Sequence, residues 1–591
     1  MKYDILNRFR EIWLLDFEYG LDSDGLPVVR CLTARELRSG RTIRLWADQL
    51  SQLSAPPFGT GPDTLFVAYY ATAELNCFTA LKWPLPCCVL DLFVEFRNMT
   101  NGRKPIGGNG LLGAMLYHQL DTIDATEKDE MRQLALRGGH YTEAEKSALL
   151  DYCESDVIAL EKLLLEMLPK IDLPYALHRG RYMKAVAQME TKGIQIDVIA
   201  QERLKGNWEA IKGRLIQDID KDSGVFDGTR FVSKNFETHL SRNKIPWPRL
   251  ESGRLALDEK TFRSMSKIYP LIAPLHELKQ SLGTMRLFDL PVGFDGRSRC
   301  MLSPFRSSTS RNQPSNTKYP FGPSVWIRGL IRPQEGYSLA YIDWSQQEFG
   351  IAAALSGDSA MIDAYLSGDP YLDFAKRVKA VPPDATKASH PEIRELYKQC
   401  ILAVQYGMGE YGLAERLGIL VIEARELLFQ HRRAFPKFWE WSEAAVNCSL
   451  LGIPLKTVFN WTLHPIPNPN PRSLANFPVQ ANGAEMMRLA AIYATEKGIR
   501  VCAPVHDAFL IEAPTSDIEA VVVDMQRLMR EASRITLGGL ELGSDVKYVH
   551  SPGRYMDERG TFMWNKVEEL LGRIEMEETL SVENDTEPTS A

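Results

Sequence analysis

Two short apolar segments that each lead into an aspartate constrain this chain most strongly. Residues 338–343 read Ser-Leu-Ala-Tyr-Ile-Asp, and residues 501–511 read Val-Cys-Ala-Pro-Val-His-Asp-Ala-Phe-Leu-Ile. Short apolar runs of this kind predict buried strands. On adjacent strands, Asp343 and Asp507 would lie close together. Two carboxylates in that position can hold a pair of divalent cations, which is the arrangement used for phosphoryl transfer.

The segment between these strands, about 391–408, predicts a helix with one functional face. Four residues in it are spaced by four: Arg394, Lys398, Leu402 and Tyr406. At about 100° per residue, this spacing keeps the four side chains on a single stripe. The two cations suit triphosphate oxygens, and the apolar and aromatic side chains suit a base or sugar. The structural alternative is an amphipathic helix with a solvated basic edge.

The first ~170 residues predict an α/β unit with a second group of acids. Asp16 and Glu18 lie on the same side of a predicted strand, because side chains repeat every two residues. Tyr152 and Asp156 lie one turn apart on a predicted helix that opens with the capping box Thr142-Glu-Ala-Glu145. A two-metal nuclease site needs such acids together with a group that orients water.

Six elements, in this order along the chain, resemble the polymerase region of family A DNA polymerases, the bacterial DNA polymerase I class. Residues 343–348 (DWSQQE) are similar to motif A, residues 394–407 match motif B (R-x3-K-x7-YG), and residues 505–508 (VHDA) are similar to motif C. The other three are residues 190–197, which resemble the segment leading into the thumb, residues 307–311 (SSTSR), which resemble the STGR segment, and residues 472–480, which resemble the R-x3-N-x3-Q helix.

The resemblance implies a role for each matching residue. The catalytic residues would be Asp343, Asp507 and Lys398, with the two aspartates binding metal. The incoming nucleotide would contact Arg394, Lys398, Leu402, Tyr406 and Glu348, the last as a steric gate against a 2′-OH. The primer and template would contact Arg311, Arg472, Asn476, Gln480 and His506. Leu402 departs from the Phe or Tyr usual in the family, and Ala508 replaces the usual glutamate after the motif C aspartate.

The N-terminal acids with their tyrosine resemble a DEDDy-type 3′–5′ exonuclease, the usual proofreading neighbour of this polymerase family. The resemblance implies Asp16, Glu18 and Asp156 as metal ligands and Tyr152 as a catalytic residue. For the remaining acid the segment Tyr70-Ala-Thr-Ala-Glu74 offers Glu74, where the family expects N-x3-D. The alternative acid is Asp91 at the end of the next strand, whose structural role would be a helix cap. A fold retained only as a scaffold is the alternative for the whole domain.

The expected fold is therefore α/β and multidomain: an RNase H-like exonuclease domain followed by a right-hand polymerase with a helical thumb. The expected domains are residues 1–175 for the exonuclease, 176–300 for the thumb, 301–360 and 440–560 for the palm, and 361–440 for the fingers. Residues 567–591 hold eight acidic residues and one arginine, and we expect this tail to be disordered.

Composition is compatible with this interpretation. The formal net charge of −7 is accounted for by the acidic tail, so a neutral body can still carry a basic groove. The nine cysteines form no CxxC pair, which argues against a zinc site and a disulfide framework. With no apolar run of membrane length and no signal peptide, we expect a cytoplasmic protein. No 5′-nuclease domain is expected before the exonuclease, as in a phage or plasmid enzyme.

The sequence thus predicts a template-directed DNA polymerase with a proofreading exonuclease. Its cofactor would be Mg²⁺, two ions per active site, with Mn²⁺ as a substitute. Its partners would be primer–template DNA and deoxynucleoside triphosphates, and we expect a monomer that binds no membrane. The alternatives are a polymerase with an inactive exonuclease scaffold, a nuclease whose polymerase half only binds DNA, a single-subunit RNA polymerase, and a non-catalytic DNA-binding protein.

Overall fold

The computed structural model describes residues 4–121, 125–284, 290–322 and 325–585. The chain forms two compact units. Unit 1 contains residues 1–193, 301–313 and 339–548, and unit 2 contains residues 194–300, 314–338 and 549–591. None of the helices in this described part of the chain is both long and apolar enough to span a membrane.

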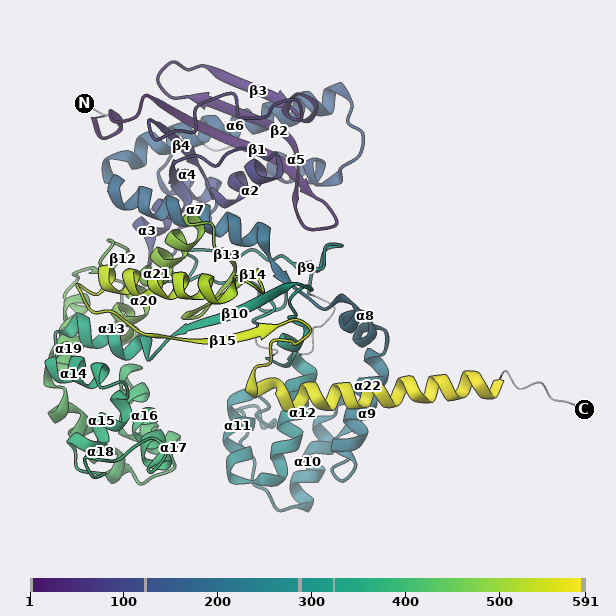
Figure 1. Ribbon diagram of the computed structural model, residues 1–591, viewed down its shortest axis with the longest axis vertical. Coiled ribbons are helices and arrows are strands. Elements are labelled where there is room, and N and C mark those ends of the chain that lie inside the picture. The colour runs from purple at the N-terminus through teal and green to yellow at the C-terminus, as the bar shows by residue number, and fades with distance from the viewer. Residues whose placement is uncertain (1–3, 122–124, 285–289, 323–324, 586–591) are drawn as a thin grey trace, which may run out of the picture. The chain divides into compact units, whose positions relative to one another are not determined.

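Unit 1 begins with a five-stranded sheet of order β3-β2-β1-β4-β5 (Figure 1). The strands are β1 (Glu11–Leu21), β2 (Pro27–Glu36), β3 (Thr42–Trp46), β4 (Thr64–Ala68) and β5 (Cys88–Asp91). β1 is antiparallel to β2 and parallel to β4, and β4 is parallel to β5. β4 is buried along its whole length, which explains its continuous apolar sequence.

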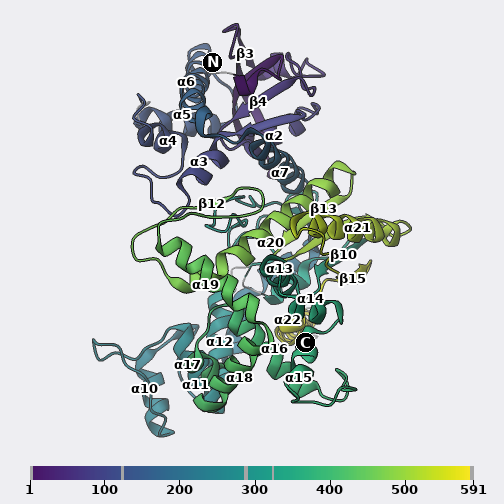
Figure 2. The same cartoon turned by 90° about the vertical axis from the view of Figure 1, so that its left-hand side faces the viewer.

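In the described residues six helices accompany this sheet, and α6 packs on β1 and β2. Figure 2 shows α6 along one side of the sheet. The six helices are α1 (Ala47–Leu50), α2 (Thr72–Ala80), α3 (Leu92–Thr100), α4 (Leu111–Tyr117), α5 (Ala125–Arg137) and α6 (Glu143–Met167). α6 starts at the predicted capping box, in which the Thr142 hydroxyl accepts from Glu145 N and the Glu145 carboxylate accepts from Thr142 N. The strand expected to carry Asp16 and Glu18 is confirmed as β1, and the helix expected to carry Tyr152 and Asp156 is confirmed as α6.

Helix α7 (Leu173–Lys192) joins this sheet to the rest of unit 1. It packs on β5 and α2 and also on elements of the second sheet, α20 (Pro471–Glu496) and β13 (Arg500–Val505). Gly180 permits the close approach, because a Cβ there would lie 1.9 Å from the Val89 carbonyl oxygen. The helix ends at Gly193, whose φ of 62° suits glycine.

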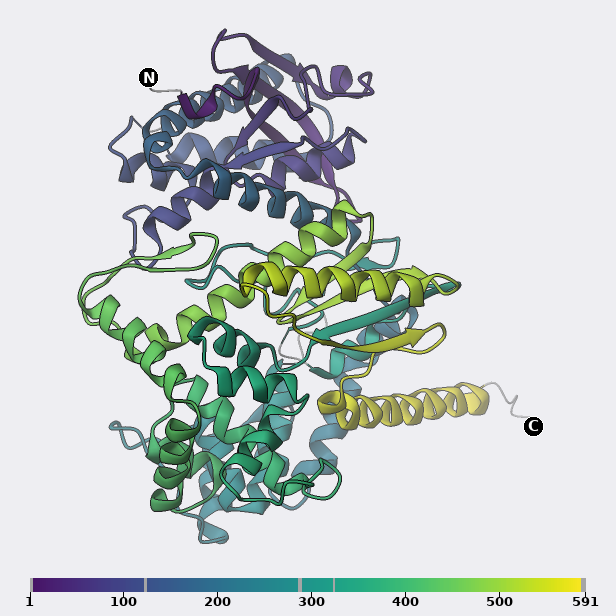
Figure 3. The ribbon, with the colours of Figure 1, turned by 60° about the vertical axis from the view of Figure 1, so that its left-hand side comes forward.

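The second sheet of unit 1 has the order β13-β14-β10-β15. Its other strands are β14 (Ala508–Pro514), β10 (Tyr337–Trp344) and β15 (Ser544–His550). Helices α20 and α21 (Ile518–Thr536) pack on each other and on β13 and β14 (Figure 3). The strand predicted to end at Asp343 is confirmed as β10. The single strand predicted over 501–511 is wrong, because this segment forms the antiparallel pair β13 and β14 with Asp507 in the turn between them, and β14 lies beside β10.

The rest of unit 1 is largely helical. It contains α13 (Gln347–Ser356), α14 (Ser359–Leu366), α15 (Pro370–Arg377), α16 (Pro391–Gln405), α17 (Glu410–Leu417), α18 (Val421–Ala434) and α19 (Pro436–Leu450), followed by a short hairpin of β11 (Leu455–Lys456) and β12 (Thr462–Leu463). The helix predicted over 391–408 is confirmed as α16, except that Tyr406 is the C-cap residue after it.

Unit 2 is mostly helical. It contains α8 (Val198–Gly206), α9 (Trp208–Asp220), α10 (Ser233–Arg242), α11 (Glu259–Ile268), α12 (Ala273–Thr284) and α22 (Glu558–Asp585), with β6 (Ile194–Gln195), β9 (Arg297–Ser298), β7 (Phe226–Asp227) and β8 (Arg230–Phe231) as two short pairs.

Helix α22 corrects the expectation of a disordered tail from residue 567. Val567, Leu570, Leu571 and Ile574 form a buried stripe at helical spacing. α22 packs on α9, and the acids of the segment form ion pairs within unit 2, Glu575 with Arg203 and Glu577 with Arg214. Apolar burial and charge pairing together outweigh the repulsion that suggested disorder. Residues 586–591 lie outside the described part.

Candidate functional site

Asp343 and Asp507 come together at one end of the second sheet, beside the inner strands β10 and β14, as predicted. Asp343 is near the end of β10, and Asp507 lies in the tight turn between β13 and β14. The turn places His506 at a φ of 54°, and Trp344 N donates a hydrogen bond to the Asp507 carbonyl oxygen at 3.3 Å. This backbone contact fixes the aspartate turn against β10.

The two carboxyls share one electrostatic environment. Burial, followed by the charge of Asp507 and a hydrogen bond with it, raises the pKa of Asp343 to about 8. Burial also raises the pKa of Asp507, and the charges of Arg311 and His506 oppose that rise. Among the described residues no hydrogen-bond partner reaches the buried Oδ1 atom of Asp343. Hard oxygens held close together, one of them unpartnered, fit a divalent cation.

A third acid, Asp545 on β15, was missed by the sequence reasoning. Ser345 binds this edge twice: its N donates to Gly543 O at 2.9 Å, and its hydroxyl donates to Asp545 Oδ2 at 2.8 Å. The charge of Asp545 contributes to the raised pKa of Asp343. Asp545 thus adds negative charge near a site where Ala508 replaces the family's glutamate. The only sequence signal was an acid at the start of a further strand.

Glu348, Tyr406 and Gln480 also converge. Tyr406 Oη donates to Glu348 Oε1 at 2.7 Å, and Gln480 Nε2 donates to the same oxygen. Burial and the bond to Glu348 raise the pKa of Tyr406 to about 12. Three predicted site residues from α13, the end of α16 and α20 therefore form one polar cluster, which holds the Glu348 carboxylate in a fixed position.

Arg394 and Lys398, the two residues of α16 predicted to bind the triphosphate, each form an ion pair with an acidic side chain. The Arg394 guanidinium pairs with Asp369 and lies 5.4 Å from the centre of the Tyr371 ring. Lys398 Nζ lies 3.4 Å from a Glu395 oxygen, on the exposed side of the helix. A phosphate ligand would have to compete with these pairs, the stronger of which is the half-buried one at Arg394.

The residues predicted to bind primer and template occupy two segments of unit 1. Arg311 lies close enough to Asp507 and Tyr406 for its charge to lower the pKa of both. Arg472, Asn476 and Gln480 follow one another on α20, whose N-cap Asn470 accepts from Arg472 N. Gln480 is buried and reaches Glu348, whereas Arg472 is exposed.

The predicted N-terminal acids also meet. Asp16, Glu18 and Asp156 each offer an oxygen, and these atoms lie within 4.8 Å of one another, the one such group among the described residues. Tyr152 Oη donates to Asp156 Oδ2 at 3.0 Å. Burial raises the pKa of Tyr152, as do the acids around it. A cluster of this composition fits a divalent cation and holds a phenol beside it.

Glu74 and Asp91, the two candidates for the remaining acid, differ in their contacts. Asp91 is the N-cap of α3, and its carboxylate also accepts from Tyr70 N and Ala71 N, so its oxygens are occupied by backbone donors. Glu74 is buried, its Oε2 has no hydrogen-bond partner in the described residues, and burial followed by the charges of Asp16 and Glu18 raises its pKa well above the ordinary value. Glu74 therefore lies close enough to Asp16 and Glu18 for their charges to raise its pKa, whereas the Asp91 carboxylate caps α3.

Comparisons with known proteins agree with the central site. Residues 320–550 match the description "DNA polymerase family A". Residues 320–550 are therefore similar to that family. The thermostable DNA polymerase I of Thermus caldophilus is 23% identical over 457 residues, which cover 71% of this chain and 52% of the relative. DNA polymerase I of Caldicellulosiruptor bescii is 30% identical over 223 residues, 35% of this chain and 26% of the relative.

The family resemblance extends to the fold. A solved structure described as the POL domain of Pol1 from M. smegmatis, in complex with DNA primer-template and dNTP, matches with a TM-score of 0.70 and 18% identity. The match covers 93% of this chain and 96% of that one. The chain spans about half the length of the Thermus relatives it matches. The similarity to family A lies in residues 320–550, which contain the aspartate pair, α16 and α20.

Proposed function

We propose that this protein is a family A, template-directed DNA polymerase that adds deoxynucleotides to a primer 3′ end. The observation that carries the proposal is the Asp343–Asp507 pair. The two carboxyls meet at one end of the second sheet, where burial raises the pKa of both and the charge of Asp507 further raises the pKa of Asp343. Such a pair is poorly stable as two free charges and is stabilised by divalent cations.

Family A polymerases generally use divalent metal ions, and we propose two Mg²⁺ ions, with Mn²⁺ as a substitute. Asp343 and Asp507 would hold them. When bound, such ions activate the primer hydroxyl and neutralise charge on the leaving pyrophosphate. Arg394 and Lys398 would orient the triphosphate after exchanging Asp369 and Glu395 for phosphate oxygens. Arg311 and the α20 residues would hold the primer end and the template.

Selection of deoxynucleotides would rest on Glu348. Tyr406 and Gln480 hold its carboxylate by two hydrogen bonds to one oxygen, so the side chain cannot easily yield to a 2′-hydroxyl. This arrangement favours a DNA polymerase over a single-subunit RNA polymerase. The similar M. smegmatis Pol1 domain, solved in complex with DNA primer-template and dNTP, supports the same substrates.

We further propose that the first ~175 residues form an RNase H-like 3′–5′ exonuclease. The supporting observation is the group formed by Asp16, Glu18 and Asp156, with Tyr152 bonded to Asp156 and Glu74 buried nearby. The acids would hold divalent cations, and Tyr152 would orient the attacking water. Among the described residues, no contact of these acids or of Tyr152 favours the other interpretation, an inactive scaffold.

A single assay tests both activities. A 5′-labelled primer on a longer template is incubated with Mg²⁺, with and without the four dNTPs. Extension with dNTPs and shortening without them are expected. Extension without shortening would contradict the exonuclease proposal, shortening without extension would favour a nuclease that only binds DNA through its polymerase half, and an unchanged primer in both arms would contradict both.

A further inference from the structure

A strained backbone segment precedes Arg311 in unit 1. Ser303, Phe305 and Ser310 all have positive φ angles, between 48° and 61°, and none of them is glycine. Each such residue costs on the order of 1 kcal/mol and persists only where the surroundings determine the conformation. Phe305 and Ser310 are fully buried. The contacts around this segment therefore decide where Arg311 lies.

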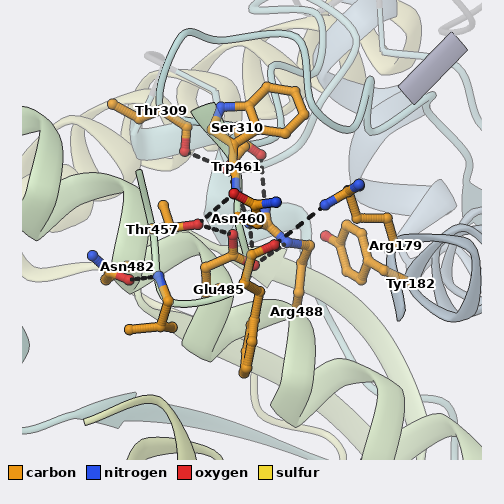
Figure 4. Close-up of polar contacts among 12 residues, drawn as sticks. Arg179, Tyr182, Thr309, Ser310, Thr457, Asn460, Trp461, Asn482, Glu485 and Arg488 are labelled. Atoms are coloured by element: carbon orange, nitrogen blue, oxygen red, sulfur yellow. Dashed lines mark hydrogen bonds and ion pairs between the residues drawn. The ribbon is translucent and has the colours of Figure 1, made fainter. Parts of the chain in front are cut away.

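Part of the support comes from α20 and the β11–β12 hairpin, as Figure 4 shows. Arg488 donates to the Ser310 carbonyl and hydroxyl oxygens, both at 3.0 Å, and pairs with Glu485, which accepts from the Thr457 hydroxyl at 2.7 Å. Trp461 Nε1 donates to Ser308 O at 2.9 Å. These partners all lie in the polymerase part of the chain.

The other part of the support comes from the N-terminal domain. Arg97 on α3 donates to the carbonyl oxygens of Phe305 and Arg306. Asn101, the C-cap residue of α3, is 1% exposed, and its amide nitrogen donates to Ser308 O at 2.8 Å and Thr462 O at 2.9 Å. Asn101 thus uses both amide hydrogens, one on the strained segment and one on the hairpin.

The same helix is anchored at its other end. Its N-cap Asp91 accepts from Tyr70 N and Ala71 N, just before α2, which carries Glu74. The Glu95 carboxylate on α3 pairs with Arg179 of α7 through two bonds of 2.7 Å, both side chains being almost fully buried. α3 is therefore a rigid connection between the candidate exonuclease acids and the segment that ends at Arg311.

We propose that Asn101 is a positioning residue of the polymerase site, which fixes Ser308 and thereby Arg311 for the primer terminus. This inference rests on the proposed role of Arg311 in primer binding. It gives the N-terminal domain a function in primer binding that does not depend on nuclease activity. In Asn101→Asp, a carboxylate would face the carbonyl oxygens of Ser308 and Thr462. All of these groups are acceptors, so both hydrogen bonds would be lost and the strained segment would be released.

The test compares Asn101→Asp with Asn98→Asp in the full chain. Asn98 is a matched control: it lies on α3 and donates to Asn460 O of the hairpin at 3.3 Å, but it does not contact residues 303–311 in any described hydrogen bond. Fluorescence anisotropy in EDTA gives the Kd for a primer–template with a dideoxy end and for a single-stranded oligonucleotide. In Mg²⁺, extension gives KM for primer–template and kcat.

For Asn101→Asp we expect about a tenfold weaker Kd and higher KM for primer–template, with single-strand binding and kcat changed less than about threefold. For Asn98→Asp, the Kd for primer–template, the Kd for single-stranded DNA, KM and kcat should all stay within about threefold of the wild-type values. Equal effects of the two variants, or an unchanged primer–template Kd in Asn101→Asp, would overturn the proposal. If Asn101→Asp fails to fold, Asn101→Ala removes the same donors without adding charge. A wild-type enzyme that does not extend primers would contradict the proposed function instead, and the binding comparison would still decide the role of Asn101.

Discussion

Glu190 on α7 offers a quantitative test of the buried polar contacts in unit 1. Its Oε1 accepts from Leu302 N at 2.7 Å, and its Oε2 accepts from Asn76 Nδ2 at 3.2 Å. Burial raises the pKa of Glu190 from 4.5 to about 7, although both hydrogen bonds oppose the rise. The folded protein therefore keeps a proton on Glu190 at pH values where the unfolded chain has lost it.

The sign follows from linkage. Below about pH 4.5 Glu190 is protonated in both states, and its contribution to stability is complete. As the pH rises from 4.5 to about 7, the folded state binds the extra proton, so the free energy of unfolding falls, and above 7 the loss is constant. A rise in the pKa of Glu190 from 4.5 to about 7, at about 1.4 kcal/mol for each tenfold change in proton affinity, gives a loss of about 3 kcal/mol.

Glu190→Gln should avoid this loss, because the amide oxygen can still accept from Leu302 N and carries no charge. We expect the variant to be more stable than the wild type at pH 8 by up to about 3 kcal/mol, an advantage that shrinks by pH 4.5. Thermal unfolding followed by calorimetry at both pH values measures this, with Glu415→Gln on the exposed face of α17 as control. A melting-temperature difference between Glu190→Gln and wild type that is the same at both pH values would refute the reasoning.

The other predictions concern the two sites. Asp343→Asn should lower primer extension at least about 10³-fold and leave shortening of single-stranded DNA unchanged, measured on denaturing gels; surviving extension would refute the metal assignment. Glu74→Gln should lower shortening at least about 100-fold, whereas Asp91→Asn should lower the free energy of unfolding by about 1 kcal/mol, as expected for a weakened helix cap, and leave shortening per folded molecule unchanged. Glu348→Ala should raise the ratio of ribonucleotide to deoxynucleotide incorporation by about 100-fold in single-nucleotide kinetics; an unchanged ratio would exclude it as the steric gate.

Local sequence patterns predicted the main elements of both sites. The strand that ends near Asp343 and helix α16 could each be located because strand and helix periods repeat over short distances, whereas the turn that carries Asp507 was expected to be part of a strand. The capping box at Thr142 located the start of the helix that carries Tyr152 and Asp156. The order of the six polymerase-like motifs along the chain indicated family A, and the family match over residues 320–550 agrees.

Where local patterns allowed two interpretations, tertiary contacts chose between them. Asp91 and Glu74 are both acids near strand ends, yet only the fold shows that backbone donors occupy Asp91 and leave Glu74 beside Asp16. In the acidic tail, charge alone suggested disorder, and the buried side of α22 against α9 shows an ordered helix.

The sequence by itself determined which chemical groups this protein carries and which local elements present them. Only the tertiary structure decided which of these groups are neighbours, such as Asp545 beside Asp343 and Asn101 beside Ser308. The physical reason is that helix and strand periods are set by backbone geometry over a few residues. A hydrogen bond or charge pair between distant segments depends instead on how whole elements pack, which no local period encodes.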